Sequence, residues 1–288
     1  MRLRAVELKV VDVAKAAEFL EQTWGLFDAG KSGNGGGGTR YFRGTGDHPY
    51  LLSLTPSTSP GVAAITFAGS AADIETFGAR TKHEKVATFD APGGGSGLIV
   101  EGPEGQRYRF VTDTNSTALP ADRNRPVELS HAVLNVTDIE AAERFAVAKL
   151  GFRVSDRTGF MRFVRCNRKH HALAFAEAQV SSLHHIAFEM RDLDAVMNGI
   201  GRMREAGFQC VWGPGRHGPG NNVFGYFISP FGAVIEYTAE VGEVGDDYRV
   251  GGPQDWKWPP GRVDQWGVSI RDSERLGAAE RAMTWTRA

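Results

Sequence analysis

HAVLNVTDIEAAERFAVAKLGF, residues 131–152, is the stretch of this sequence that decides the fold. It opens with the alternating apolar residues of a strand, passes through Asp138, a natural helix N-cap, and ends an amphipathic helix at Gly151. The same pattern recurs at three other places, which begin at Ala5, Ala64 and His185. A motif that occurs four times predicts a repeated structural unit.

Material that reads as three short strands with Gly and Pro turns follows each helix. The unit is therefore β-α-β-β-β, roughly 55 to 65 residues long, and such a unit must pair with a neighbour to bury a sheet face. We predict an α+β protein of four βαβββ modules paired into two domains, residues 1–120 and 121–240. A Trp-rich tail, residues 241–288, is expected to pack on the second domain or at a subunit interface.

The composition is that of an ordinary soluble globular protein. A net charge of −1 gives the chain no attraction to nucleic acid or to an anionic membrane. The sequence shows neither an apolar run long enough to span a membrane nor the apolar core of a signal peptide, so we expect a cytoplasmic protein. Cys166 and Cys210 lack C-x-x-C spacing and are interpreted as reduced, unpaired thiols.

Aligning the four copies separates the two halves chemically. The first letters of the copies are, in order, Ala5, Ala64, His131 and His185. In the last strand of each half, Arg109 in the first half corresponds to Glu236 in the second. The second half thus carries His, His and Glu where the first carries Ala, Ala and Arg, which core packing does not explain.

A lone histidine on a strand is usually a core or rim residue, but two at matching positions together with a carboxylate favour a metal site. Because successive strand residues point to opposite faces, only one of His184 and His185 is expected to face it, and the repeat selects His185. His184 is then structural or a hydrogen-bond partner of the ligand. Two imidazoles and one carboxylate with open positions suit Fe(II) and oxygen activation, with Mn(II) as the alternative.

Four pieces of the second half resemble the type I extradiol catechol dioxygenases of the vicinal oxygen chelate superfamily: SHAVLNV, NRKHHALAF, LHHIAFEM and GRHGPGNNVFGYFISPFGAVIEY. The resemblance implies this superfamily's fold, a homo-oligomer, and cleavage of a small aromatic diol by O2 beside its hydroxyl groups. It implies no organic cofactor. By the same resemblance His131, His185 and Glu236 match the Fe(II) ligands, His171 matches an acid–base histidine, and His217 and Tyr226 match residues that contact the catechol.

One segment departs from that pattern. Residues 218–221, Gly-Pro-Gly-Asn, stand where many members have a polar Asn-Asp-His segment. Plainer interpretations also exist for the three non-metal residues: His171 as a strand end at the rim, His217 as a solvated loop residue and Tyr226 as an ordinary strand aromatic.

Two other functions compete with ring cleavage. A glyoxalase-like lyase or isomerase of the same superfamily would use four protein ligands, but the closing strand of the third copy offers Ala172 and Ala174, which cannot bind a metal. A non-catalytic, drug-sequestering module of the same fold would lack the ligand triad altogether. One fold hosts many functions, so only the site discriminates between them.

Overall fold

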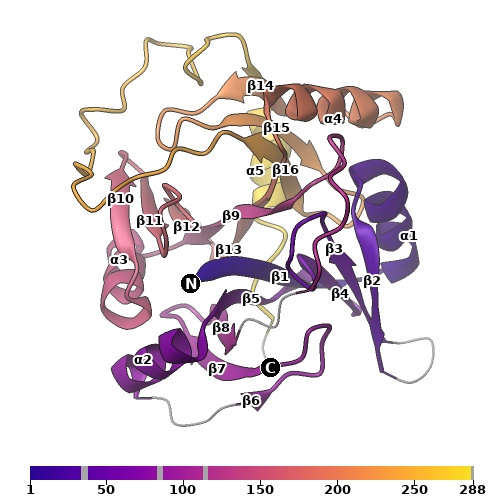
Figure 1. The fold of residues 1–288 in the computed structure, drawn as a ribbon. Helices are drawn as coiled ribbons and strands as arrows, with labels where there is room; N and C mark the ends of the chain where they lie inside the picture. Colours follow the sequence, from indigo (N-terminus) through magenta and orange to yellow (C-terminus); the bar gives the residue numbers. More distant parts are fainter. Residues whose placement is uncertain (34–37, 83–86, 113–115, 287–288) are drawn as a thin grey trace.

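The computed structural model describes residues 1–33, 38–82, 87–112 and 116–286, and its strands form two mixed sheets (Figure 1). The first sheet contains β1 (Arg2–Val10), β2 (Phe27–Ser32), β3 (Thr39–Arg43), β4 (Leu52–Pro56), β5 (Gly61–Gly69), β6 (Ala87–Thr88), β7 (Ser96–Glu101) and β8 (Arg107–Thr112). Among the described residues its strand order is β2-β3-β4-β1-β5-β8-β7-β6.

The second sheet repeats this arrangement. It contains β9 (Glu128–Val136), β10 (Arg153–Arg157), β11 (Met161–Arg165), β12 (Leu173–Glu177), β13 (Ser182–Glu189), β14 (Trp212–Arg216), β15 (Val223–Ile228), β16 (Val234–Ala239) and β17 (Ile270–Arg271). Its order is β10-β11-β12-β9-β13-β16-β15-β14-β17. In both sheets the two opening strands pair antiparallel at the centre, and each pairs in parallel with the closing strand of its own module. The predicted α+β class of paired βαβββ modules is confirmed; the domain bounds stay a prediction.

Most helices lie around the outside of the sheets, and the last helix of the chain lies near the centre of the view (Figure 1). The helices are α1 (Val13–Glu18), η1 (Phe19–Trp24), α2 (Ala71–Thr81), α3 (Ile139–Phe145), η2 (Ala146–Leu150), α4 (Leu193–Glu205) and α5 (Ser273–Glu280). Asp12, Asp138 and Asp192 cap the first, third and fourth modules' helices by accepting a backbone N–H three residues later. In the first and third modules the last turn widens to a π-helix and stops at a left-handed glycine, Gly25 or Gly151.

The buried face of α4 does not include all of its apolar residues. Val196, Ile200 and Met203 are buried, but Met197, which has the same helical spacing, is 44% exposed. The buried face continues instead over small residues such as Gly199, where an added Cβ would lie 2.8 Å from the ring of Tyr237. The helix therefore approaches the sheet along its small residues, and this turns Met197 outward.

An aromatic stack joins the first module to the last. The ring of Trp24, at the end of η1, lies 3.7 Å from the ring of Tyr237 in β16, with an interplanar angle of 5°. The Tyr237 hydroxyl donates to the carbonyl oxygen of Trp24 at 2.5 Å and accepts from Arg202 at 2.8 Å. These contacts hold β16, the strand that carries Glu236, against the N-terminal module.

Residues 283–286 form a second junction between the sheets. Leu183 in β13 donates its backbone N–H to Met283 O at 2.8 Å, and Val62 in β5 donates to Thr284 O at 2.9 Å. Thr286 returns a hydrogen bond to Val62 O at 2.9 Å. The segment thus pairs with one strand of each sheet. In the described part of the chain, no helix is long and apolar enough to cross a membrane.

Candidate metal centre

Strand register places the four modules' key residues in equivalent positions. In every module, the residue two places after the opening one pairs in parallel with the closing strand. These pairs are Glu7–Ser53, Thr66–Arg109, Val133–Ala174 and Ala187–Glu236. Arg109 and Glu236 therefore correspond, as the repeat predicts. Ala174 takes the equivalent place in the third module and offers no ligand there.

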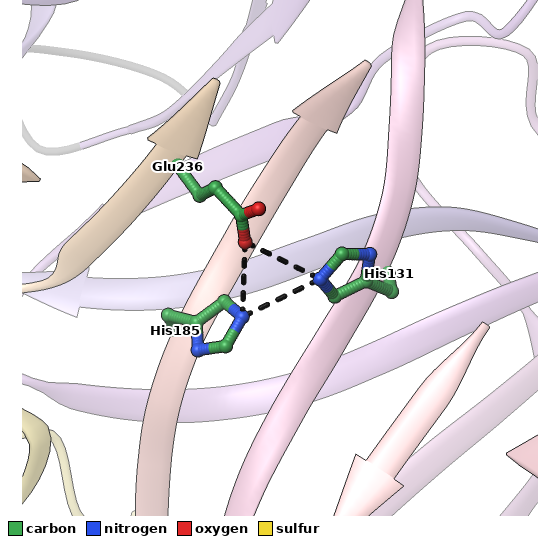
Figure 2. Close-up of side chains that lie close together, drawn as sticks. All are labelled: His131, His185 and Glu236. Carbon is green, nitrogen blue, oxygen red and sulfur yellow. Dashed lines mark hydrogen bonds and ion pairs between the residues drawn. The ribbon is translucent and has the colours of Figure 1, made fainter. Parts of the chain in front are cut away.

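His131, His185 and Glu236 converge on one point from β9, β13 and β16 (Figure 2). The Nε2 atoms of the two histidines lie 3.4 Å apart, and they lie 3.3 Å and 3.1 Å from Glu236 Oε2. Ligand atoms that share one ion at about 2.1 Å are separated by about 3.0 to 3.4 Å. The spacing of the three atoms therefore fits a single metal ion.

The chemical state of the three groups also fits a cation. Burial alone would raise the pKa of Glu236, but His131 and His185 outweigh it, so the pKa of this carboxyl is lowered and it stays ionised. Its Oε2 atom is buried and makes no hydrogen bond. Ser130 Oγ lies 3.0 Å from Nδ1 of His131, so the N–H of that ring can point to the hydroxyl and leave the lone pair on Nε2. A divalent ion would satisfy all three atoms.

His184 and His185 both line the cavity beside the triad, which is described below, so the expectation that only one of them could face the site is wrong. The β9–β13 register shifts between Leu183 and His185, and this bulge breaks the strict alternation of side chains. The Nδ1 atoms of the two rings lie 2.7 Å apart. His184 is thus the hydrogen-bond partner of His185, which was one of the two roles expected for it.

His171 stands at the end of a hydrogen-bonded chain that begins at a carboxylate. Asp156 Oδ2 lies 2.7 Å from His170 Nε2, and His170 Nδ1 lies 3.0 Å from His171 Nδ1. Asp156 in turn accepts from Gly251 N at 2.7 Å and from the Tyr248 hydroxyl at 3.2 Å, both in the tail. If His170 donates to Asp156, His171 donates from Nδ1 and keeps its lone pair on Nε2. Burial, then the neighbouring histidines, lowers the pKa of His171 well below its usual value.

His217 and Tyr226 lie together beside the triad. His217 Nε2 is 2.9 Å from the Tyr226 hydroxyl and 4.0 Å from Glu236 Oε1. Burial raises the pKa of Tyr226, and the charge of Glu236 raises it further, so the phenol keeps its proton. Burial lowers the pKa of His217 to about 3, so this ring is neutral at pH 7. The pair can offer one hydrogen bond to a bound ligand.

A cavity of about 840 Å³ is lined by His131, His171, His185, His217 and Tyr226, and the tail forms part of its wall through Trp256 and Trp258. The folded structure explains why residues 218–221 differ from the polar Asn-Asp-His segment of many superfamily members. An added Cβ on Gly218 would lie 2.8 Å from the Trp258 ring, and one on Gly220 would lie 3.0 Å from the His171 ring. Glycine at these positions lets the tail and His171 approach the loop closely.

The equivalent position in the first sheet is filled by an ion pair. Arg109 bonds to Glu7, and the Thr66 hydroxyl donates to the same carboxylate at 2.8 Å. The buried carboxylate is thus compensated by a guanidinium. Asp156, Ser130 and Glu280 (which lies 3.2 Å from His184) were not predicted from the sequence. Only the doublets His170–His171 and His184–His185 hinted at such networks.

Comparison with known proteins agrees with the fold. Residues 128–237 match the model of the Glyoxalase/Bleomycin resistance protein/Dioxygenase superfamily. Metapyrocatechase 2 of Cupriavidus necator is 31% identical over 196 residues, covering 65% of this chain and 57% of the relative. An iron-dependent extradiol dioxygenase of Rhodococcus jostii is 27% identical over 180 residues, covering 57% and 59%. The matched segments thus span less than two thirds of these curated relatives.

A solved structure covers almost the whole chain. The Mn(II)-bound glyoxalase from Novosphingobium aromaticivorans is 31% identical, with a TM-score of 0.85, and the match covers 96% of this chain and 93% of that one. The similarity therefore extends through both sheets, beyond the segment that carries the triad. The protein belongs to the Glyoxalase/Bleomycin resistance protein/Dioxygenase superfamily.

Proposed function

We propose that this protein is an extradiol dioxygenase that cleaves the ring of an aromatic vicinal diol. The observation that carries the proposal is the three-residue group His131, His185 and Glu236, whose two histidines line a cavity together with His171 and Tyr226. Three ligands leave positions free for a diol and O2, as non-haem Fe(II) oxygenases require. The names of two relatives, a metapyrocatechase and an extradiol dioxygenase, support the same chemistry.

Fe(II) is the metal proposed for this group, with Mn(II) as the alternative because a similar structure holds Mn(II). When bound, the ion would hold the diol and O2 side by side and carry electrons from one to the other. A divalent ion bound by one carboxylate and two neutral imidazoles has one net positive charge, which a singly deprotonated diol would balance. The buried walls favour that neutral total.

His171 is proposed as the acid–base residue. Its lowered pKa keeps it neutral at pH 7, and the hydrogen-bond chain from Asp156 through His170 directs its lone pair to Nε2. That nitrogen can take the second hydroxyl proton of the diol and return it later to the oxygen that leaves. Asp156 holds the two rings in place, as an orienting carboxylate does in a catalytic triad.

Tyr226 and His217 are proposed to position the diol. The Tyr226 phenol keeps its proton and can donate it to a substrate oxygen as negative charge develops there. His217, 2.9 Å from that hydroxyl, holds the phenol in place and contacts the same end of the substrate. Both side chains come from the β14–β15 hairpin, so their spacing is fixed by one pair of strands.

The proposed reaction breaks the ring C–C bond between one hydroxyl-bearing carbon and the adjacent carbon that bears no hydroxyl group. Both atoms of O2 enter the product. No external reductant is needed, and the product is a ring-opened hydroxy-semialdehyde. Anaerobic loading with Fe(II), followed by a panel of catechols under air, tests this directly. We expect a yellow product with one O2 consumed per diol, whereas loaded protein that consumes no O2 with any diol would refute the proposal.

A second candidate is metal-dependent chemistry of the glyoxalase kind, favoured by the 31% identity to the Mn(II)-bound glyoxalase over nearly the full chain. Against it, Ala174 replaces the fourth ligand that such sites tend to use, by the register described above. Isomerase or lyase turnover by the Mn(II) form without O2 would favour this candidate. Turnover that needs O2 would favour ring cleavage.

The homo-oligomer expected from the sequence stays a prediction. Light scattering after size exclusion, at the concentration used for the activity assay, would give the number of subunits. A monomer with full ring-cleavage activity would contradict the expectation.

A further inference from the structure

Glu280, the last residue of α5, is linked to the metal-facing His185 through one intervening ring. Glu280 Oε1 lies 3.2 Å from Nε2 of His184, and Nδ1 of His184 lies 2.7 Å from Nδ1 of His185. Nε2 of His185, on the far side of that ring, faces Glu236 at 3.1 Å. A carboxylate of the tail therefore lies at ion-pair distance from a ring that is hydrogen-bonded to His185.

Only one direction of the His184–His185 hydrogen bond leaves His185 able to bind a metal. If Nδ1–H of His185 donates to His184, then the proton of His184 is on Nε2, facing Glu280, and the lone pair of His185 is on Nε2. In the reverse direction the proton of His185 sits on Nε2 and points into the triad. An anionic acceptor at the end of the chain selects the first arrangement, because a carboxylate cannot donate.

The place of Glu280 does not depend on its carboxylate. Its backbone oxygen accepts from Asn135 Nδ2 at 2.9 Å and from Ser182 Oγ at 2.7 Å. Leu276 on the same helix and Met283 just after it are fully buried. The backbone and the apolar residues thus dock α5 on the second sheet, and the carboxylate faces His184 and the guanidinium of Arg271, which lies 3.6 Å from the same Oε1 atom.

We propose that Glu280 is a positioning residue which, through His184, fixes the tautomer and orientation of His185. The inference rests on the metal role proposed above for His185. It makes metal retention depend on the docking of α5, far along the chain from the ligands. Groups that orient a metal-bound histidine in this way typically contribute about 10- to 100-fold to metal affinity.

Three variants separate this relay from a simple effect of charge. Glu280→Leu removes both charge and acceptor, Glu280→Gln removes the charge but keeps an oxygen acceptor, and His184→Phe removes the middle ring but keeps the charge. Mn(II) affinity is measured by the EPR signal of free Mn(II), without diol or O2. We expect about 10- to 100-fold weaker binding for Glu280→Leu and His184→Phe, and a smaller loss for Glu280→Gln.

If Glu280 acted through its charge alone, Glu280→Gln and Glu280→Leu would lower Mn(II) affinity equally, and His184→Phe would leave it unchanged. That pattern would overturn the proposal. Glu274→Gln, on the exposed start of α5, is the matched control and should bind Mn(II) like the wild type. The melting temperature of each metal-free variant shows whether it is folded. Because Gln has nearly the shape of Glu, Glu280→Gln can be compared with the wild type even if Glu280→Leu does not fold. Wild-type protein that binds no divalent ion would instead refute the proposed metal centre itself.

Discussion

Arg109 and Glu236 hold the same position in the two sheets, each in register with the residue two places beyond its module's opening residue. In the first sheet the position carries a guanidinium that bonds to Glu7, and in the second it carries a carboxylate whose Oε2 has no hydrogen-bond partner. One architecture thus compensates its buried charge internally in one half and leaves it for a cation in the other.

Glu236→Gln tests that difference. The amide keeps the size of the side chain but loses the charge, so we expect Mn(II) or Fe(II) affinity to fall at least about 100-fold. A metal at 100 times its Kd stabilises the wild type by about 2.7 kcal/mol, which raises Tm by roughly 5 to 10 °C. Thermal unfolding with and without metal should show this rise in the wild type and not in the variant. An equal rise in both would contradict the assigned ligand.

His171→Phe should abolish most catalysis without affecting the metal. Loss of an acid–base group lowers kcat about 10²- to 10⁴-fold, while Mn(II) affinity should change little because the ring is not a ligand. Asp156→Asn should lower kcat less, since the amide oxygen still accepts but the anion that orients His170 is gone. Steady-state kinetics with metal titration checks both. A His171→Phe variant with wild-type kcat would exclude the proposed role.

Tyr226→Phe should lower kcat about 10- to 100-fold, because one donor to the developing charge is lost. Tyr237→Phe is the matched control in the adjacent strand. It removes a hydroxyl that bonds to Trp24 O and Arg202, so it should cost about 1 to 3 kcal/mol of stability and leave kcat unchanged. Denaturant titration and kinetics on both variants distinguish the two roles. A loss of kcat in Tyr237→Phe but not in Tyr226→Phe would contradict the proposed role of Tyr226.

Mild acid should destabilise the metal-free protein. Burial lowers the pKa of several histidines, namely His171, His184, His185 and His217. In the unfolded chain each takes up a proton below pH about 6.5, whereas the folded chain keeps it neutral, so stability falls as pH falls. Urea unfolding at pH 7.5 and 5.5 should differ by a few kcal/mol, up to about 1.4 kcal/mol for each histidine. Equal or higher stability at pH 5.5 would refute this.

Trp258→Ala should weaken substrate binding alone. Trp258 lines the cavity, whereas Trp266 is equally exposed, at 39%, but lies outside the cavity wall and serves as control. Loss of about 1.5 kcal/mol of apolar contact raises KM roughly 10-fold. Neither kcat nor metal affinity should change. If Trp266→Ala raises KM as much, the effect comes from the tail as a whole.

The sequence predicted the metal-facing group because its signals are local and repeated. Each copy has a strand with period-two alternation followed by a capped helix, and this fixes where His131, His185 and Glu236 stand in the sheet. Parallel pairing within a module then brings the opening and closing strands together. A single motif without its repeat would not have distinguished His185 from His184.

The partners of these groups lie outside such local rules. Asp156 and Glu280 reach His170 and His184 from other elements, and nothing near them in sequence signals the contact. The bulge before His185 breaks the alternation on which strand predictions rest. Similarly, Gly218 and Gly220 are explained only by the rings that approach them in the folded chain.

The pairing of residues 283–286 with both β5 and β13 has a consequence for biosynthesis. During translation this segment leaves the ribosome after both strands that it joins. The two sheets can therefore fold around the Trp24–Tyr237 stack before residues 283–286 pair with them. Glu280, just before the segment, therefore reaches His184 only after the strands that carry the triad have been made.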